Sequence, residues 1–370
     1  MNVKNLRLIN FRNYNNVYLE LDDKLNIFIG KNAQGKTNLL EAIYVSATGK
    51  SFRTNRDREL INFNKKEAYI GSKVQIGERE KLIEIKLDRI APKRIKINKL
   101  ELKKQKELNS GLNVVVFSPD DLSLVKGSPK ERRLFLDTSI SQVKPVYRYN
   151  LNRYNKILIQ RNNLLKAGKS KKDLVNLLDI FDMQLVKTGT DIIISRFNFI
   201  DKLSKVALNI HNRLTLNKEK LLLNYDSSIS FKNLNRQEIE SSFIKSLKEN
   251  RYKDMLTGST STGPHRDDMK IYINNMDSRT FASQGQQRTI VLTIKLSEVE
   301  IIYKDTGSYP VLLLDDVFSE LDSDRRKYLI SFFKNTQTFI TSTDIENLDE
   351  LMDSNPLMFT IENGNIKYKE

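Results

Sequence analysis

One segment near the start of the chain constrains the fold more than any other. It matches the pattern G-x-x-x-x-G-K-T and reads Gly30-Lys31-Asn32-Ala33-Gln34-Gly35-Lys36-Thr37. Residues 25–29 before it form a mostly apolar run of buried-strand length, and residues 38–45 after it are a good helix sequence. The two glycines let the backbone wrap tightly, so that successive N–H groups point at phosphate oxygens. The segment therefore predicts a phosphate-binding loop between a strand and a helix.

The side chains of this loop suit a nucleoside triphosphate with Mg²⁺, and we expect ATP. Lys36 would reach the β- and γ-phosphates and take part in the chemistry, and the Thr37 hydroxyl would ligate the metal. The rest of the loop would line the phosphates, namely Gly30, Lys31, Asn32, Ala33, Gln34 and Gly35. The competing interpretation is an ordinary glycine turn before a helix, which the flanking strand and helix disfavour.

Two adjacent carboxylates late in the chain complete the expected site. Residues 309–314 predict a buried strand, and Asp315 and Asp316 follow it directly. A P-loop ATPase needs a distant carboxylate to hold Mg²⁺ and, if it hydrolyses, a group that orients the attacking water. Both carboxylates can reach the phosphates because the chain turns at the carboxyl end of the strand. We assign Asp315 to the metal and Asp316 to the water; a strand that merely ends in solvated acids is the alternative.

A second anion site is predicted upstream, where a helix begins close to Ser283, Gly285 and Gln286. A hydroxyl, a glycine and the free N–H groups of a helix N-terminus suit a γ-phosphate. One chain does not need two γ-phosphate cradles, but two protomers that sandwich the nucleotide would each supply one. Residues 319–322, Ser-Glu-Leu-Asp, would then lie at the same interface. A plain helix cap with a glycine turn is the alternative.

The excess of basic over acidic residues indicates which kind of binding partner to expect. Lys and Arg number 62 against 46 Asp and Glu, so the formal net charge is +16. This favours a polyanion such as nucleic acid, while a ribosome-associated or membrane-surface protein would share the balance. The lysine-rich runs at residues 93–106 and 166–172 are either flexible surface or phosphate contacts without sequence readout, since neither carries interleaved aromatics.

Other classes are excluded by composition. The absence of Cys excludes disulfides, thiolate metal sites and Cys nucleophiles, and two His cannot alone build a zinc centre. No run approaches the roughly 18 apolar residues of a membrane span, and the N-terminus does not read as an export signal. We therefore expect a cytoplasmic protein without membrane contact.

In the middle of the chain, the spacing of the apolar residues changes to that of helices. Apolar residues recur at helical spacing over residues 151–165 and again over 174–216, and the glycine- and lysine-rich residues 168–172 predict a turn between them. We expect a helical hairpin or small bundle. No heptad pattern is sustained long enough for an extended coiled coil.

The order of these motifs resembles the head of an ABC-type ATPase, and residues 30–42 are similar to those of SMC and recombination ATPases. Residues 119–137, 263–268, 282–289 and 313–322 resemble the RecF family of bacterial recombination mediators, along nearly the whole chain. The resemblance implies an α/β fold: an ABC-type P-loop ATPase head with a mainly helical inserted lobe and no long coiled coil. We expect residues 1–117 and 271–370 to build the head and residues 118–270 the helical lobe.

The same resemblance implies a function in recombinational DNA repair and replication-fork maintenance. ATP would join two heads on duplex DNA, slow DNA-stimulated hydrolysis would release them, and the protein would help to load recombinase at single-strand gaps, with RecR and RecO as partners. Two departures from the ABC pattern bear on hydrolysis. Asp316 stands where Glu is usual, which fits slow turnover, and any γ-phosphate contact of the usual switch His would fall to Thr343.

Two further interpretations of the whole chain stay open, an ABC-type transport subunit and a structural DNA protein that binds ATP without useful turnover. Individual residues are open as well. His265 is either an interface or DNA-contact element or part of a local salt-bridged turn, and His211 is expected to be structural. Arg132 and Arg133 either order a loop between the lobes or lie on a solvated face.

Overall fold

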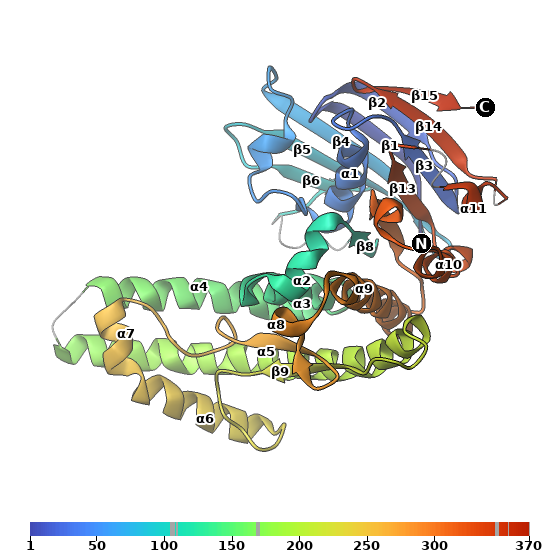
Figure 1. Cartoon of the computed structure of the whole chain (residues 1–370). Helices are drawn as coiled ribbons and strands as arrows, with labels where there is room; N and C mark the ends of the chain where they lie inside the picture. Colours follow the sequence, from blue (N-terminus) through green and yellow to red (C-terminus); the bar gives the residue numbers. More distant parts are fainter. Residues whose placement is uncertain (104–107, 109, 168–170, 345–347, 354, 370) are drawn as a thin grey trace. The chain divides into compact units, whose positions relative to one another are not determined.

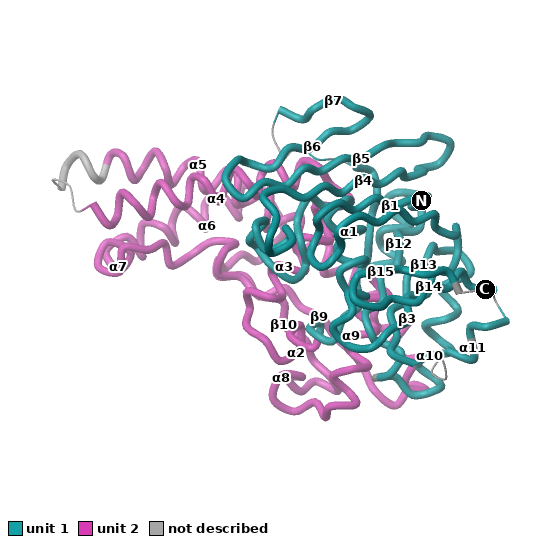
Figure 2. The backbone as a smooth tube through the Cα atoms, turned by 90° about the horizontal axis from the view of Figure 1, so that it is seen from above, with its two compact units in different colours: residues 1–121, 298–370 teal, residues 122–297 magenta. Residues whose placement is uncertain are grey.

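The computed structural model describes residues 1–103, 108, 110–167, 171–344, 348–353 and 355–369. The chain divides into two compact units (Figure 2): unit 1 holds residues 1–121 and 298–370, and unit 2 holds residues 122–297. Unit 1 is an α/β body that carries the phosphate-binding loop, and unit 2 is mainly helical. An α/β body interrupted by a helical insertion is what the sequence predicted.

The boundaries between the units fall after residues 121 and 297 of the chain, whereas the sequence predicted boundaries after residues 117 and 270. The strand β10 (Asp268–Ile273) explains the later second boundary, because it pairs antiparallel with β9 (Leu221–Asp226) inside unit 2. Residues 271–297 therefore group with the helical unit. The helix α9 (Gln284–Thr306) begins in unit 2 and ends in unit 1.

Two sheets build unit 1 (Figure 1). Strands of the first pair antiparallel in the order β2-β1-β4-β5-β6-β7. In the second, β14, β3, β13, β12 and β8 run parallel in that order, and β15 pairs antiparallel with β14. The bounds are β1 Asn2–Phe11, β2 Tyr14–Glu20, β3 Leu25–Ile29, β4 Glu67–Ile76, β5 Arg79–Asp88, β6 Arg94–Ile97, β7 Leu100–Glu101, β8 Val114–Phe117, β12 Val311–Asp315, β13 Thr338–Ser342, β14 Leu357–Glu362 and β15 Asn365–Lys369.

The helix α1 (Lys36–Thr48) lies in the core that both sheets share. Its Leu39 and Ile43 belong to one cluster with Leu8 of the first sheet and with Phe28 and Leu313 of the second. All five side chains are fully buried. A helix that is apolar around most of its circumference is stable when it is covered on all sides. This packing therefore fixes where the N-terminus of α1, and with it the phosphate-binding loop, lies in unit 1.

Unit 2 is built on two long helices that run side by side, α4 (Pro145–Ala167) and α5 (Lys171–Leu214) (Figure 1). They form the predicted hairpin, while most of the predicted turn, residues 168–170, lies outside the described residues. Among the described residues, no helix combines the length and apolarity needed to cross a bilayer. The remaining elements are α2 Ser123–Lys126, α3 Pro129–Val143, α6 Arg236–Glu249, α7 Arg251–Thr257, β11 Met276–Asp277, α8 Ser278–Phe281, α10 Ser323–Ile330, α11 Asp349–Met352 and the 3₁₀ turns η1 Asp57–Leu60, η3 Pro119–Leu122, η4 Val317–Glu320 and η5 Phe333–Asn335.

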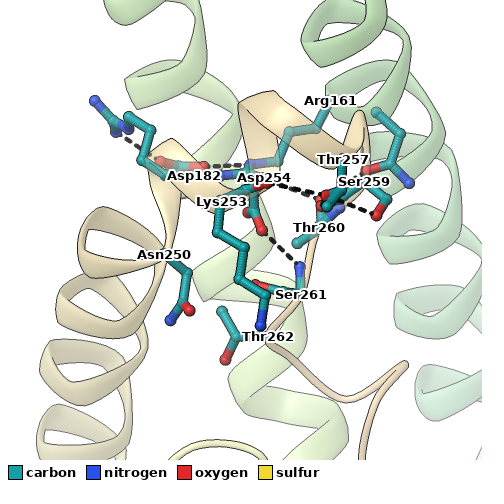
Figure 3. Close-up of polar contacts among 12 residues, drawn as sticks. Arg161, Asp182, Asn250, Lys253, Asp254, Thr257, Ser259, Thr260, Ser261 and Thr262 are labelled. Atoms are coloured by element: carbon teal, nitrogen blue, oxygen red, sulfur yellow. Dashed lines mark hydrogen bonds and ion pairs between the residues drawn. The ribbon is translucent and has the colours of Figure 1, made fainter.

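A buried ion cluster joins three helices of unit 2 (Figure 3). Arg161 on α4 donates through Nε to Asp182 on α5 at 2.6 Å and through Nη1 to Asp254 on α7 at 2.8 Å. The same Nη1 also donates to the Thr260 hydroxyl at 2.9 Å. The side chains of Arg161 and Asp254 have no exposed surface. Because these charges are removed from water, each depends on its partners.

We predict that Asp254→Ala lowers the free energy of unfolding by about 3–5 kcal/mol, because it leaves part of the Arg161 charge buried without a partner. Lys205→Ala is the control, since it removes an ion pair with Asp201 whose side chains are 74% and 50% exposed. That change should cost less than about 1 kcal/mol. Guanidinium unfolding of both variants measures the difference; equal and small losses would contradict the prediction.

Candidate functional site

The predicted phosphate-binding loop connects β3 to α1, and two of its glycines are required by the structure. A Cβ added to Gly30 would lie 2.4 Å from the carbonyl oxygen of Ile361. Gly35 has a φ of +118°, and a Cβ there would lie 2.5 Å from Asn13 Nδ2. Glycine alone adopts such a conformation readily and permits such close approach. The pattern G-x-x-x-x-G thus predicted the two points where the loop packs against its surroundings.

The turn between β1 and β2 and the first residue of β2 hold this loop from one side. Asn13 Nδ2 donates to the carbonyl oxygen of Gln34 at 2.7 Å, and the Tyr14 hydroxyl donates to that of Gly35 at 3.0 Å. Burial raises the pKa of Tyr14, which keeps this hydroxyl protonated as a donor. Asn38 Nδ2 in turn donates to Asn13 Oδ1 at 2.8 Å. Asn13 therefore links the loop to the first turn of α1.

Lys36 and Thr37 begin α1 and lie close to the first predicted carboxylate. Only 4% of Lys36 is exposed, and its ammonium donates to the carbonyl oxygens of Gly30 at 2.6 Å and Lys31 at 3.2 Å. The Thr37 hydroxyl donates to Asp315 Oδ1 at 2.8 Å, across 278 positions of sequence. The structure thus brings together the cation, the hydroxyl and the carboxylate that the sequence assigned to one site.

The two carboxylates at the end of β12 differ in their surroundings. Asp315 is buried and accepts a second hydrogen bond, at 2.9 Å, from the Thr341 hydroxyl on β13. Asp316 has a φ of 52°, a left-handed conformation that is uncommon outside glycine, and its N–H donates to the same hydroxyl at 3.0 Å. Thr341 therefore holds both residues in place. Thr343, to which the sequence assigned any γ-phosphate contact of the usual switch His, follows this strand, and its hydroxyl donates to Asp344 at 3.0 Å.

A pocket of about 770 Å³ opens over the loop and lies entirely in unit 1. Its volume is within the range of about 300–1,000 Å³ that is typical of small-molecule sites. Predicted site residues that line it are Asn32, Ala33, Gly35, Lys36, Thr37 and Asp316. The further lining residues are Arg12, Asn13, Asn38, Arg53, Arg58, Glu59, Ile61, Phe63 and Arg89, all of which sequence reasoning missed.

Arg12 shows why such residues escape a motif search. Its guanidinium forms a two-pronged ion pair with the buried Glu41 of α1, at 2.8 and 2.7 Å, and donates to the carbonyl oxygen of Glu59 at 2.8 Å. Arg53 reaches the same part of the pocket and donates to Asn38 at 2.9 Å. Neither arginine belongs to a recognisable spacing, so only the folded chain places them beside the loop. Their charges suit an anionic ligand.

The second predicted anion site lies in unit 2, at the start of α9. Ser283 and Gly285 are exposed, and a Cβ on Gly285 would meet nothing within 4 Å. Ser283 Oγ accepts from the N–H of Gln286 at 3.3 Å, while Gln286 Oε1 accepts from the N–H of Ser283 at 2.9 Å. This reciprocal pair is a capping box. The helix cap that the sequence offered as an alternative is thus present, and the side chain of Gln286 serves it.

A series of hydrogen-bonded side chains holds this cap in place inside unit 2. Gln286 Nε2 donates to Glu219 at 2.9 Å, and the other carboxylate oxygen of Glu219 lies 3.2 Å from His211 Nε2. His211 Nδ1 lies 3.1 Å from the Thr293 hydroxyl on α9. The fully buried His211 is therefore a structural residue, as expected, and its contacts support the orientation of Gln286 and so of Ser283.

The segment at residues 263–268 is tied to its own unit at nearly every residue. Arg132 on α3 forms a buried two-pronged ion pair with Asp268, at 2.7 and 2.9 Å. Arg133 donates to the carbonyl oxygen of Asp267 at 2.6 Å, and the Ser228 hydroxyl donates to the Asp267 carboxylate at 2.8 Å. Arg132 and Arg133 thus order a segment, as one of the two interpretations has it, and that segment lies within unit 2.

His265 of this segment is partly buried and has a hydrogen-bond partner at each ring nitrogen. Its Nε2 lies 3.0 Å from the carbonyl oxygen of Thr260, and its Nδ1 lies 2.7 Å from the Tyr154 hydroxyl. A carbonyl oxygen only accepts, so Nε2 carries the proton and Nδ1 accepts from Tyr154. Burial lowers the pKa of His265 to about 4, which keeps the ring neutral near pH 7. The geometry favours the local turn over an interface or DNA-contact element, and hydrogen bonds of His265 hold this turn.

The residues at the loop suit a magnesium ion that is held jointly with phosphates. Mg²⁺ prefers oxygen ligands and usually takes one or two from protein side chains, with waters and phosphates completing the shell. The Thr37 hydroxyl and the Asp315 carboxylate supply two such oxygens within 2.8 Å of each other. In the described part of the chain, no group of three or more His, Cys, Asp or Glu residues could hold a metal by itself.

Comparison with known proteins agrees with the motifs. The family model RecF/RecN/SMC N-terminal domain matches residues 2–367. The DNA replication and repair protein RecF of Clostridium tetani is 46% identical over 364 residues, which cover 98% of this chain and 99% of the relative. That of Alkaliphilus oremlandii is 47% identical over 367 residues, covering 99% and 100%. The chain belongs to the RecF family.

Solved structures give the same result. A structure of the recombination mediator protein RecF with ATP superposes with a TM-score of 0.92 at 37% identity, covering 100% of this chain and 98% of that one. An Smc head domain from Pyrococcus furiosus, at 17% identity and a TM-score of 0.55, shares the fold alone. The predicted RecF resemblance and fold class are confirmed. Because the chain belongs to a family of DNA replication and repair proteins, the alternative that it is an ABC-type transport subunit is wrong.

The environment of His265 predicts a pH dependence of stability. An unfolded His titrates near 6.5, whereas burial lowers the pKa of His265 to about 4, so the unfolded chain binds more protons between these values. Stability should therefore be fully retained above pH 6.5 and fall as the pH drops toward 4, by about 3 kcal/mol for this residue. In His265→Phe this part of the pH slope should disappear. Urea unfolding from pH 7.5 to 4.5 measures it; an unchanged slope in the variant would contradict the assignment.

Proposed function

We propose that this RecF-family protein is an ATP-dependent DNA-binding ATPase of recombinational repair and replication-fork maintenance. One observation carries the proposal: the Thr37 hydroxyl meets the Asp315 carboxylate at 2.8 Å, beside Lys36 and under the 770 Å³ pocket. P-loop ATPases need this combination where the terminal phosphates of ATP bind. The solved relative with ATP, which shares 37% identity, supports the choice of nucleotide.

The loop would bind ATP through its backbone and through Lys36. The ammonium now donates to the loop carbonyls of Gly30 and Lys31, and a bound triphosphate would replace these acceptors with β- and γ-phosphate oxygens. Thr37 and Asp315 would hold Mg²⁺, which supplies charge neutralisation to the phosphate oxygens when it is bound. Thr341, which donates to Asp315, would keep this carboxylate oriented.

Hydrolysis would depend on Asp316, which lines the pocket with Lys36 and Thr37. Its carboxylate would orient a water whose oxygen forms a bond to the γ-phosphorus while the bond to the β,γ-bridging oxygen breaks, giving ADP and phosphate. Asp is one methylene shorter than Glu, and its backbone is held by Thr341 in a left-handed conformation. The shorter side chain favours slow turnover, because its carboxylate would lie farther from the water.

Two protomers would share the nucleotide. The exposed Ser283 hydroxyl and the uncrowded Gly285 at the start of α9 suit the γ-phosphate of an ATP bound to another chain, because a helix N-terminus offers free N–H groups to anions. The capping box and the Glu219 contact would hold Ser283 ready for this role. ATP would then join two chains, and hydrolysis would separate them.

Duplex DNA is the proposed polyanion. The formal net charge is +16, and the described residues of the lysine-rich run 93–106 include exposed Arg94, Lys96, Lys99 and Lys103. Lys93 itself is held by Asp57 and by the carbonyl oxygen of Gly49, at 2.9 and 2.6 Å. Backbone contact by such side chains gives affinity without sequence readout.

The solved relatives are placed in the RecFOR pathway, so we extend RecO and RecR to this chain as partners at gapped and single-stranded DNA, where recombinase is loaded. Bacterial DNA lies in the cytoplasm, and we place the protein there.

A second candidate function is that of an ATP-binding DNA protein without useful turnover. The short carboxylate at Asp316 favours it, and phosphate release with and without duplex DNA separates the two.

A complementation experiment tests the shared site. Lys36→Ala should abolish or severely weaken ATP binding, because the loop loses the cation aimed at the terminal phosphates. Ser283→Arg should leave ATP affinity nearly intact, yet lose phosphate release, because the bulky side chain stands where the partner's nucleotide must dock. In a mixed dimer one composite site carries both lesions and the other carries none, so a mixture should recover part of the activity.

Calorimetry with ATP and a phosphate-release assay on each variant and on the mixture give the readouts. Thr257→Ala in unit 2 is the control, since its hydroxyl bonds only to neighbouring residues in the part of the chain that the structure describes. That variant should hydrolyse ATP like the wild type. Full hydrolysis by Ser283→Arg, or a mixture of variants that stays inactive although mixed dimers form, would refute the shared site.

DNA binding should depend steeply on salt and little on sequence. If the charge excess acts through several phosphate contacts, the affinity for duplex DNA should fall by about 10³-fold or more between 50 and 200 mM salt. Fluorescence anisotropy with labelled duplexes of unrelated sequence measures both properties. A strong preference for one sequence in competition, or a flat salt profile, would contradict the proposal.

A further inference from the structure

The turn of the hairpin formed by β14 and β15 (Figure 1) contacts the phosphate-binding loop across 329 positions of sequence. Glu362 pairs with Asn365, so the turn consists of Asn363 and Gly364, whose φ angles are 50° and 77°. Two left-handed residues in a two-residue hairpin loop are typical of a type I′ turn, for which Asn-Gly is a preferred sequence. The Asn363 N–H donates to Gln34 Oε1, and the Gly364 N–H donates to the Gln34 carbonyl oxygen at 3.3 Å. The turn therefore binds one loop residue through both of its backbone donors.

The turn between β1 and β2 holds the same loop residue. Asn13 Nδ2 donates to the Gln34 carbonyl oxygen at 2.7 Å. A Cβ added to Gly364 would lie 2.5 Å from the Asn13 carbonyl oxygen, so the two turns also pack against each other. Gln34 is not among the pocket-lining residues of the described chain, and its side chain serves the hairpin instead.

These hydrogen bonds fix the direction of two N–H groups of the loop. In a trans peptide the carbonyl oxygen and the following N–H point in opposite directions, and the described chain has no cis peptide bond. Because both turns hold the Gln34 carbonyl oxygen, the Gly35 N–H points away from them. The Tyr14 hydroxyl holds the Gly35 carbonyl oxygen and so orients the Lys36 N–H in the same way. Gly35 and Lys36 both line the pocket, so their donors are oriented before a ligand arrives.

We propose that Gln34 and the turn Asn363–Gly364 are positioning residues of the nucleotide site, which hold the phosphate-binding loop in the conformation that binds phosphates. The inference rests on the proposed ATP site and adds a support from residues that do not line the described pocket. A loop that is already held in place loses less conformational freedom when its ligand binds, which raises affinity. The support acts on the backbone around the phosphates, so it should affect every ligand of the loop, with or without a base.

Gly364→Ala tests the turn, because the added Cβ would press on Asn13 and the φ of this residue is unfavourable for alanine. We expect ATP and inorganic tripolyphosphate both to bind roughly 3- to 10-fold more weakly, the equivalent of about one lost hydrogen bond. Gly77→Ala is the matched control. Gly77 lies in the two-residue turn between β4 and β5 with a φ of 59°, and a Cβ there would meet nothing within 4 Å. That variant carries the same kind of backbone strain and should bind both ligands like the wild type in calorimetry.

Gln34→Met tests the same support from the side of the loop. Methionine has a similar length but lacks the amide oxygen that accepts from the Asn363 N–H, so ATP should bind more weakly, by less than in Gly364→Ala. The double variant should bind ATP about as weakly as Gly364→Ala alone, because both changes release the same contact. Asn363→Gly should match the wild type, because glycine keeps the N–H and adopts the left-handed conformation readily.

Several results would overturn the inference while the ATP site stands. They are unchanged ATP affinity in Gly364→Ala, an equal loss in Gly77→Ala, a loss for ATP but not for tripolyphosphate, and fully additive losses in the double variant. If Gly364→Ala does not fold, Gln34→Met decides alone, and unchanged affinity there overturns the inference. A wild-type protein that binds neither ATP nor tripolyphosphate would instead refute the proposed function.

Discussion

The hydrogen bond between Thr37 and Asp315 is the contact on which the site depends. It joins the first helix to the end of a strand 278 positions later, at 2.8 Å. The bond can form because α1 is buried between two sheets, with Leu39 and Ile43 covered on all sides. Packing fixes the helix, the glycines fix the loop before it, and the parallel strand β12 delivers the carboxylate. The apolar core thus determines the geometry of a polar site.

In the helical unit, buried polar contacts define the geometry. Arg161 is paired there with Asp254, and Arg132 with Asp268. The partly buried His265 is held as a neutral ring. Buried pairs of this kind add little net stability, but they penalise any arrangement that leaves a charge alone. The cap at Ser283 is held in the same manner, through Gln286 and Glu219. The proposed contact with a phosphate on another chain would benefit from such defined geometry.

Motifs with a strict backbone requirement were predictable from the sequence, and the surroundings of the site were not. The loop at residues 30–37, the strand at 25–29 and the carboxylate of Asp315 were found because glycine and buried strands leave clear patterns. Arg12, Phe63 and Arg89 carry no pattern, since they reach the pocket only through sheet pairing and a bridge between distant segments. The β9 strand and the helices α6 and α7 were also missed, and with them the later boundary at residue 297. The roles of the site residues remain predictions.

The central claim is that ATP, held at Lys36 of one chain, joins that chain to Ser283 of another. Sedimentation velocity of the full-length protein without nucleotide, with ADP, and with a slowly hydrolysed ATP analogue tests this most directly. The account predicts a shift to the mass of a dimer with the analogue alone, since only a γ-phosphate can reach the second chain. The same sedimentation coefficient in all three conditions, at nucleotide concentrations that saturate the pocket, would contradict it.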